Sequence, residues 1–246
     1  MAKVKSLLQI TGSLDDLTFY TLNGQAVVRR KGGGFTSKGV KKGANYVRTR
    51  ENASEFGHCS AFSKQLRVAV QPLLGPKAFD SMHQHLVKVL FAIKNLDTIS
   101  ARGKRHVGQG IQHPEAASLL HGFSFNPHCA LDHVLKAPYS LTDSVFNISQ
   151  FTPVEAFHFP KGATAVGLEF GACVFDFLKG EGRLGALSTA VLDQDGSEQD
   201  LELPATVPAG TGTLLYVLKI AFYQQAGGER YLFKNKEYGT VALLIA

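Results

Sequence analysis

The side chains best suited to chemistry in this sequence are basic residues gathered near the N-terminus. Eight of them fall within one stretch of the chain: Arg29, Arg30, Lys31, Lys38, Lys41, Lys42, Arg48 and Arg50. Phe35 and Tyr46 lie among them. Cationic groups neutralise phosphates, aromatic rings stack on nucleobases, and Arg forms paired hydrogen bonds with carboxylates. We therefore interpret the stretch as a contact site for a nucleic acid or for an acidic protein surface.

The other candidates for catalysis or metal binding are weak. His83 and His85 are two positions apart on an expected helix, so their side chains point in different directions and suit one metal ion poorly. The adjacent pairs His58-Cys59 and His128-Cys129 form a zinc site only if the fold brings them together. No GxSxG motif marks a serine nucleophile, and nothing selects a base for a cysteine. We expect a protein that is not an enzyme, with no catalytic residue, no metal site and no cofactor.

Two further runs resemble ligand-binding loops only superficially. Gly32-Gly33-Gly34 is not part of the GxxxxGKS/T pattern that cradles a phosphate. Residues 193–202 (DQDGSEQDLE) carry carboxylates without the spacing of a calcium-binding EF-hand loop. We interpret the first as a pliable basic loop and the second as a solvated hairpin loop.

The charge of the chain is unevenly spread. Residues 1–110 hold 18 Lys or Arg against 6 Asp or Glu, which gives +12, whereas residues 111–246 hold 8 against 14, which gives −6. A basic half of this strength attracts a nucleic acid, an anionic lipid or an acidic protein surface, and the acidic half of another copy of the chain is one such surface. The alternative is that the basic side chains only keep an exposed face hydrated.

Local patterns predict an N-terminal β-hairpin followed by two helices. Asn23-Gly24 separates the alternating runs 17–22 and 25–30, and this dipeptide is the strongest short signal for a hairpin turn. Apolar residues at helical spacing predict a helix from about residue 53 to 74. Its expected inward face consists of Phe56, Cys59, Phe62, Leu66, Val70 and Leu73. A second helix is expected at 77–96, and a Gly-Pro corner between the two favours an αα-hairpin.

The sequence changes after residues 100–110, a basic connector that contains glycine. Short strand-like runs then follow one another at 123–125, 145–151, 165–170, 172–178, 185–192, 212–224, 229–233 and 240–245. This spacing is typical of a β-sandwich. The last run must be buried in its own sheet or against the edge of a neighbour's sheet. We expect an α+β protein: residues 1–110 form a basic hairpin, arm and two-helix region, and residues 111–246 form an acidic, antiparallel, immunoglobulin-like β-sandwich.

The composition is that of a globular protein, with 44% hydrophobic and 19% charged residues. No apolar run reaches the roughly 18 residues of a membrane span, and the N-terminus has no signal-peptide pattern. Three cysteines far apart, Cys59, Cys129 and Cys173, argue against a disulfide framework. We expect synthesis in the cytoplasm, and leave open a later place in an extracellular or particle assembly.

Two stretches resemble the N-terminal signature of an uncharacterised bacterial protein family. They are LLQITGSLDDLTFYTLNGQAVVRRKGG (residues 7–33) and ANYVRTRENASEFGHCSAFSKQLRVAVQPLL (residues 44–74). The resemblance extends to FHFPKGATAVGLEF (residues 157–170) and the closing hairpin, and so covers most of the chain. It implies a hairpin, a basic loop and a helix ahead of a β-rich C-terminal part. It implies no activity, substrate or catalytic residue.

The charge split, the flexible basic arm and the hydrophobic final strand favour a structural subunit that assembles with itself as a filament, shell or appendage component. A basic face that meets an acidic face is a heterologous contact, which propagates into a ring or a filament. The alternative is a nucleic-acid-binding protein that uses the basic arm. A ligand-binding sandwich, with stacking surfaces supplied by Tyr139, Tyr216, Tyr223 and Tyr231, and an enzyme without a recognisable motif are the remaining hypotheses.

Overall fold

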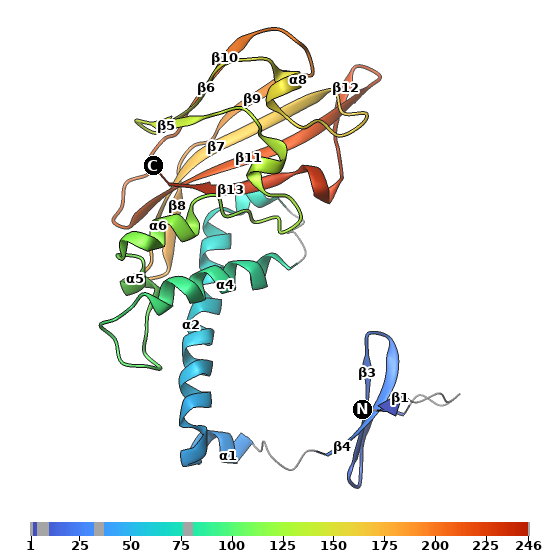
Figure 1. Ribbon diagram of the computed structural model, residues 1–246, viewed down its shortest axis with the longest axis vertical. Helices are drawn as coiled ribbons and strands as arrows, with labels where there is room; N and C mark the ends of the chain where they lie inside the picture. Colours follow the sequence, from blue (N-terminus) through green and yellow to red (C-terminus); the bar gives the residue numbers. More distant parts are fainter. Residues whose placement is uncertain (1, 4–9, 32–36, 76–80, 246) are drawn as a thin grey trace. The chain divides into compact units, whose positions relative to one another are not determined.

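The computed structural model describes residues 2–3, 10–31, 37–75 and 81–245 (Figure 1). The chain is a mixed α+β protein whose sheets are antiparallel. It divides into two compact units, Met1–Arg50 and Glu51–Ala246, which we call unit 1 and unit 2. The predicted division lay between residues 110 and 111. The expected connector, residues 100–110, belongs to unit 2 in the structure, where Val107 is fully buried.

Unit 1 contains a four-stranded antiparallel sheet in the order β1-β4-β3-β2. Its strands are β1 (Ala2–Lys3), β2 (Gly12–Leu14), β3 (Leu17–Leu22) and β4 (Gln25–Arg30). Asn23 and Gly24 join β3 to β4 with φ angles of 51° and 77°. Positive φ at both positions is what a two-residue turn between twisted strands requires. Helix α1 (Ser37–Lys42) and the 3-10 turn η1 (Ala44–Tyr46) follow.

The helices of unit 2 lie before its strands and between them in the chain. They are α2 (Val47–Ala69, which begins in unit 1), α3 (Gln71–Leu74), α4 (Met82–Asn95), α5 (Val107–Gly110), α6 (Pro114–Leu120), α7 (Leu131–Val134) and α8 (Pro153–Ala156). Helix α2 begins before its expected start near residue 53, and residues 77–80, which were expected to begin the second helix, lie outside the described chain. No helix among the described residues is both long enough and apolar enough to span a membrane.

One prediction for the inward face of α2 is wrong. Phe56 is 54% exposed, whereas its neighbour Glu55 is buried. The buried face of the helix passes through Glu55, Cys59 and Phe62 at helical spacing. Glu55 occupies the inward position because two basic side chains from distant parts of unit 2 neutralise it there.

Unit 2 holds two antiparallel sheets. The smaller has the order β10-β6-β5, with β5 (Ser140–Thr142), β6 (Val145–Phe151) and β10 (Gln199–Pro204). The larger is curled and is built on two long strands, β7 (Ala165–Asp176) and β11 (Thr213–Ala226) (Figure 1). Strand β7 also pairs with β8 (Glu181–Leu184) and β9 (Ser188–Asp193). Strand β11 also pairs with β12 (Glu229–Leu232) and β13 (Thr240–Leu244). The hydrophobic final strand is therefore buried in its own chain's sheet.

Two expectations for single strands fail. A break near Gly171 was expected, but β7 continues through it, because Gly171 pairs with Val217 in an uninterrupted ladder with β11. The run 123–125 forms no strand, and Ser124 makes only an isolated bridge to Ala242.

The central sheet separates two hydrophobic cores. Side chains alternate along a strand, so successive residues of β7 and β11 enter opposite cores. On one face Phe175 and Val217 pack against α2 and α4, through residues such as Leu66. On the other face Phe170 and Leu218 share a core with the smaller sheet. Figure 1 shows the helices gathered towards one end of the sheets, with α8 and β10 at the other end.

Candidate functional site

The predicted contact residues all belong to unit 1. The strand β4 carries Arg29 and Arg30, Lys31 follows it, α1 carries Lys38, Lys41 and Lys42, and the first turn of α2 carries Arg48 and Arg50. All except Arg50 are exposed. The structure therefore gathers them into two runs, one at the end of β4 and one along α1 and α2. The glycines Gly32–Gly34 and Phe35, which join these runs, lie outside the described residues.

Two of the basic side chains have local partners. The Arg50 guanidinium donates to the carbonyl oxygens of Val40 and Gly43, both at 2.8 Å, and so fastens the end of α1 to the turn before α2. The Arg29 guanidinium lies over the Tyr20 ring, 5.6 Å from its centroid, in a cation–π contact. Arg50 is therefore a structural residue of unit 1, and Arg29 is held on one face of the sheet.

The charge of unit 1 is largely uncompensated. Residues 1–50 hold 10 Lys or Arg against 2 Asp or Glu, a net charge of +8. No carboxylate among the described residues pairs with Arg29, Arg30, Lys31 or the three lysines of α1. The side chains of Arg30, Lys31 and the three lysines of α1 are therefore available to an external anion.

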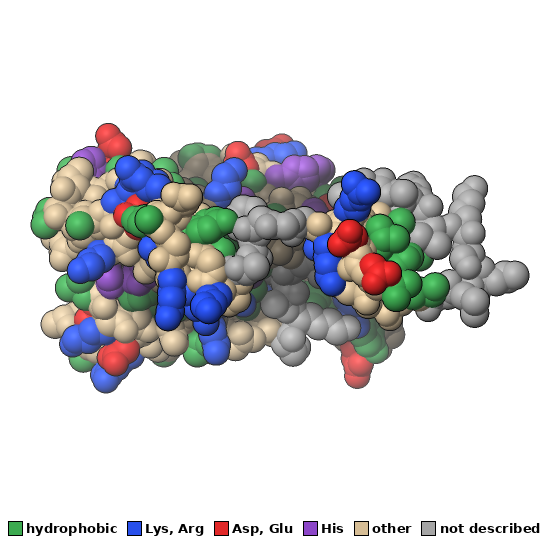
Figure 2. All heavy atoms as spheres, turned by 90° about the horizontal axis from the view of Figure 1, so that it is seen from below, with side chains coloured by type: hydrophobic (Ala, Val, Ile, Leu, Met, Phe, Trp, Pro, Cys, Tyr) green, Lys and Arg blue, Asp and Glu red, His purple; other side chains and the backbone are tan. Residues whose placement is uncertain are grey.

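The sheet of unit 1 also has an apolar face. Cross-strand pairing places Leu14 opposite Leu17 and Phe19 opposite Val28, all on one face. Leu14 is 65% exposed and Leu17 is 39% exposed. Within residues 10–31 and 37–50, Val27 alone is buried. Figure 2 shows hydrophobic side chains at the surface of this small sheet beside Lys and Arg side chains.

Unit 2 contains a buried ion cluster that the sequence did not reveal. The Lys94 ammonium lies 2.5 Å from Glu55 Oε2, and Arg105 donates to both oxygens of Glu55 at 2.9 and 3.1 Å. The amide of Gly103 donates to Glu55 Oε1 at 2.7 Å. Burial raises the pKa of Glu55, but the hydrogen bonds from Arg105, Lys94 and Gly103 outweigh it and lower the pKa to about 2. A carboxylate aligned with the apolar face of α2 is the one signal that could have revealed the cluster.

The connector after α4 is held by two further groups. Asp97 accepts the amides of Ile99, Ser100 and His106 at 2.9–3.0 Å, and these bonds outweigh burial and lower its pKa to about 2. His58 Nε2 accepts the Val107 amide at 3.1 Å, and its ring lies tilted against that of His106 with centroids 4.0 Å apart. Burial, reinforced by His106, lowers the pKa of His58 to about 4.

This cluster positions the chain rather than a reactive group. The nearby Cys59 thiol is fully buried, and burial raises its pKa to about 11, so it stays protonated. Among the described residues, the partners of Glu55 and Asp97 are main-chain amides, basic side chains and the side chain of Ser100, all in unit 2. The described residues include no group of three or more potential metal ligands.

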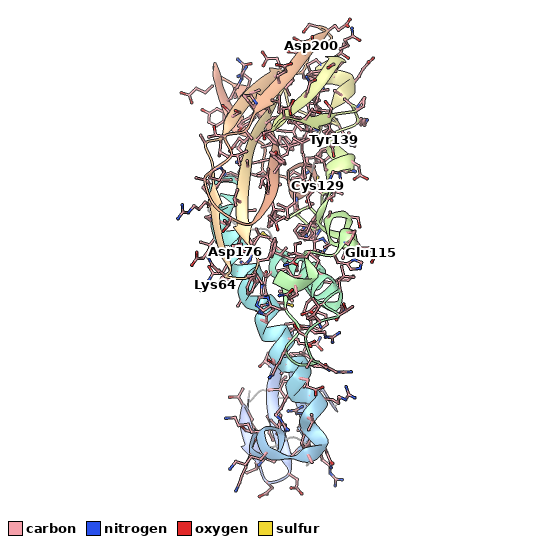
Figure 3. All side chains as sticks on the ribbon, turned by 90° about the vertical axis from the view of Figure 1, so that its left-hand side faces the viewer. Lys64, Glu115, Cys129, Tyr139, Asp176 and Asp200 are labelled. Atoms are coloured by element: carbon pink, nitrogen blue, oxygen red, sulfur yellow. The ribbon has the colours of Figure 1, made fainter. Side chains whose placement is uncertain are left out.

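A hollow of about 530 Å³ opens at the other end of unit 2. It is lined by residues from three separate segments, Lys136–Pro138, Ser149–Thr152 with Glu155 and Ala156, and Glu198. The Thr152 hydroxyl oxygen is buried and has no hydrogen-bond partner in the described structure. Exposed carboxylates also occur along residues 193–202, a stretch that includes Glu198 of the hollow. Figure 3 shows one of them, Asp200 of β10, at the end of unit 2 remote from Asp176 and Glu115.

Comparison with known proteins identifies no relative: no family model, no curated protein and no solved structure matches the chain.

Proposed function

We propose that this protein is a non-enzymatic structural subunit that assembles with copies of itself, with unit 1 of one copy docking on the acidic surface of unit 2 of another. The observation that carries the proposal is the exposed apolar face of the unit 1 sheet. A small sheet needs a packed face to be stable, and this one buries a single side chain among residues 10–31 and 37–50. A partner surface supplies the missing core.

The apolar face supports affinity, and the charges support the choice of partner surface. Burial of a leucine side chain contributes about 1.5–3 kcal/mol, so Leu14 and Leu17 supply more than the 0–1 kcal/mol typical of an exposed ion pair. Face-to-face packing of two unit 1 sheets would bring two charges of +8 together. Residues 51–246 hold 16 basic and 18 acidic residues, and five of the acidic ones fall within 193–202. Electrostatic complementarity therefore favours unit 2 as the partner.

Contact between two different surfaces does not close on itself as a twofold dimer does. It propagates into a ring or an open filament, according to the rotation between neighbours. A subunit that forms rings or filaments in this way would serve as a component of a filament, a shell or an appendage. Cytoplasmic synthesis, a later place in an extracellular or particle assembly, and an immunoglobulin-like strand arrangement stay predictions.

Light scattering of the untagged protein tests the proposal, in buffers between about 0.05 and 0.5 M salt because screening covers that range. We expect large species at low salt that become smaller as salt rises. The Leu14→Ser/Leu17→Ser variant should stay monomeric at both salts. The matched variant Ile99→Ser/Leu119→Ser, which changes exposed apolar residues of unit 2 that do not line the hollow, should behave like the wild type. A wild-type monomer at high concentration and low salt would refute self-assembly.

The second candidate function is nucleic-acid binding through the same basic residues. The observation that favours it is the exposure of Arg30, Lys31 and the lysines of α1 without carboxylate partners in the described structure. Binding of this kind falls steeply with salt because counterions are released from the phosphates. Fluorescence anisotropy with labelled single- and double-stranded DNA and RNA measures it. Substitution of Arg29, Arg30, Lys31, Lys41 and Lys42 by Gln should abolish binding, and absence of binding at low salt would dispose of this function.

A further inference from the structure

The hollow beside α8 has walls that suit a cationic side chain. Glu155 and Glu198 both line it, both are exposed, and neither pairs with a basic residue among those described. Lys136 also lines it but lies beyond ion-pair distance of either carboxylate. The Thr152 hydroxyl oxygen belongs to the same wall but is buried. The hollow thus offers two carboxylates that have no basic partner among the described residues.

The surface around the hollow extends the negative charge. Residues 193–202 contain five carboxylates and no basic residue. Of these, Asp193 pairs with Arg230 at 2.8 Å, and Asp200 accepts the Gln150 amide at 2.7 Å. This amide belongs to a residue of the hollow, so the acidic connection is fastened to the hollow wall. The hollow and the connection therefore form one continuous acidic surface.

We propose that this hollow is the receptor for the basic run Arg29, Arg30 and Lys31 of a second copy of the chain. The inference rests on the self-assembly proposed above and names its contact. An Arg guanidinium has five N–H donors, which suit a wall that carries two carboxylates. Charge complementarity identifies the occupant, because unit 1 carries +8 and its three consecutive cations have no carboxylate partner in the described structure.

The proposal predicts a specific behaviour of mixtures. In the receptor variant, Glu155→Gln/Glu198→Gln, the hollow has lost both carboxylates and the basic run is intact. In the arm variant, Arg29→Gln/Arg30→Gln/Lys31→Gln, the basic run is neutral and the hollow is intact. Each variant alone lacks one side of every contact. A mixture can form one contact only, between the run of the receptor variant and the hollow of the arm variant.

Mass photometry at low salt, near the lowest concentration that assembles the wild type, tests this behaviour. We expect each variant alone to give the monomer of 26.6 kDa, and an equimolar mixture to give a species of twice that mass and nothing larger. A matched control, Glu115→Gln/Glu181→Gln, removes two exposed carboxylates from α6 and β8 and should assemble like the wild type. Circular dichroism verifies that each variant is folded.

The outcomes separate this inference from the function on which it rests. A wild-type protein that stays monomeric overturns self-assembly itself. A wild type that assembles, together with a receptor variant that assembles equally well, overturns only the hollow as receptor. Variants that are each monomeric and remain monomeric when mixed overturn the pairing of the hollow with the basic run.

Discussion

The ammonium of Lys94 lies 2.5 Å from the carboxylate of Glu55, and both side chains are excluded from solvent. The two residues come from different helices, α4 and α2, and Lys94 also lies over the Phe91 ring at 3.7 Å from its centroid. A charge in such a place is tolerated only when it is paired. The pair therefore fixes how α4 crosses α2.

Removing one member of this pair should destabilise unit 2 strongly. We expect Glu55→Gln to lower the free energy of unfolding by about 3–5 kcal/mol, because Lys94 is left buried without a counter-charge. Lys94→Met should cost less, since Glu55 keeps Arg105 and the Gly103 amide. Urea denaturation measures both. The half-exposed pair Lys219–Glu169 is the control: Lys219→Met should cost less than about 1 kcal/mol. Equal effects of Lys94→Met and Lys219→Met would contradict this account.

The stability of unit 2 should decrease with acidity in two stages. His58 has a folded-state pKa of about 4, below the unfolded value of about 6.5, so the unfolded chain binds the proton more readily. Stability is therefore lost as the pH falls from 6.5 towards 4, by at most about 1.4 kcal/mol per pH unit for this one proton. Protonation also removes the acceptor for the Val107 amide.

Glu55 and Asp97 produce the second stage. Their folded-state pKa values of about 2 lie below the ordinary values, so their contribution is present above pH 4.5 and disappears as the pH falls towards 2. Denaturant titrations at a series of pH values resolve the two windows. His58→Gln should flatten the upper window and leave the lower one. An unchanged pH profile in this variant would show that His58 does not cause the upper stage.

The three cysteines should be inert in the folded protein. Cys59, Cys129 and Cys173 are buried, and burial raises the pKa of each to about 11. Because the thiolate is the reactive form, labelling with a thiol reagent at pH 8 should be slow until the chain is denatured, when all three react. Rapid labelling of one cysteine in the native protein would identify a local opening that the structure does not contain.

Two glycine substitutions should act in opposite directions. A Cβ atom at Gly110 would overlap the carbonyl oxygen of Ile93, so Gly110→Ala should destabilise the protein by about 3 kcal/mol through overpacking. Gly57 lies within α2 with open space around it, and Gly57→Ala should add up to about 1 kcal/mol of helix stability. Thermal unfolding compares the two. A tolerated Gly110→Ala would mean that α5 and α4 are not in close contact.

The mixture of helices and antiparallel strands could be predicted because its signals are local. Alternation and helical spacing are read within a few residues of one another. The burial of Glu55 could not be predicted in this way, since Lys94 and Arg105 are 39 and 50 positions away. Phe56 was assigned to the core because it is an apolar residue at helical spacing, and the ion cluster took the inward position of that turn instead.

The two candidate sites also differ in whether their residues are close together in the sequence. The basic residues of unit 1 are consecutive or nearly so, and a run of like charge is visible in a sequence. The structure adds that Arg50 binds within unit 1, because its guanidinium donates to two main-chain carbonyl oxygens there. The hollow is built from segments around residues 137, 151 and 198, and no local pattern joins them. Three-dimensional proximity alone brings Glu155 and Glu198 together.

The strand β13 supplies alternate side chains to both cores of unit 2: Val241 and Leu243 to the helical core, and Ala242 and Leu244 to the core between the sheets. Its partner β11 lies immediately upstream of β12, so both strands are among the last parts of unit 2 to be synthesised. Neither core can be completed before β13 has left the ribosome. The nascent chain therefore carries the apolar faces of α2 and α4 unburied until β11 and β13 have been synthesised, so we expect both cores of unit 2 to be completed together and late.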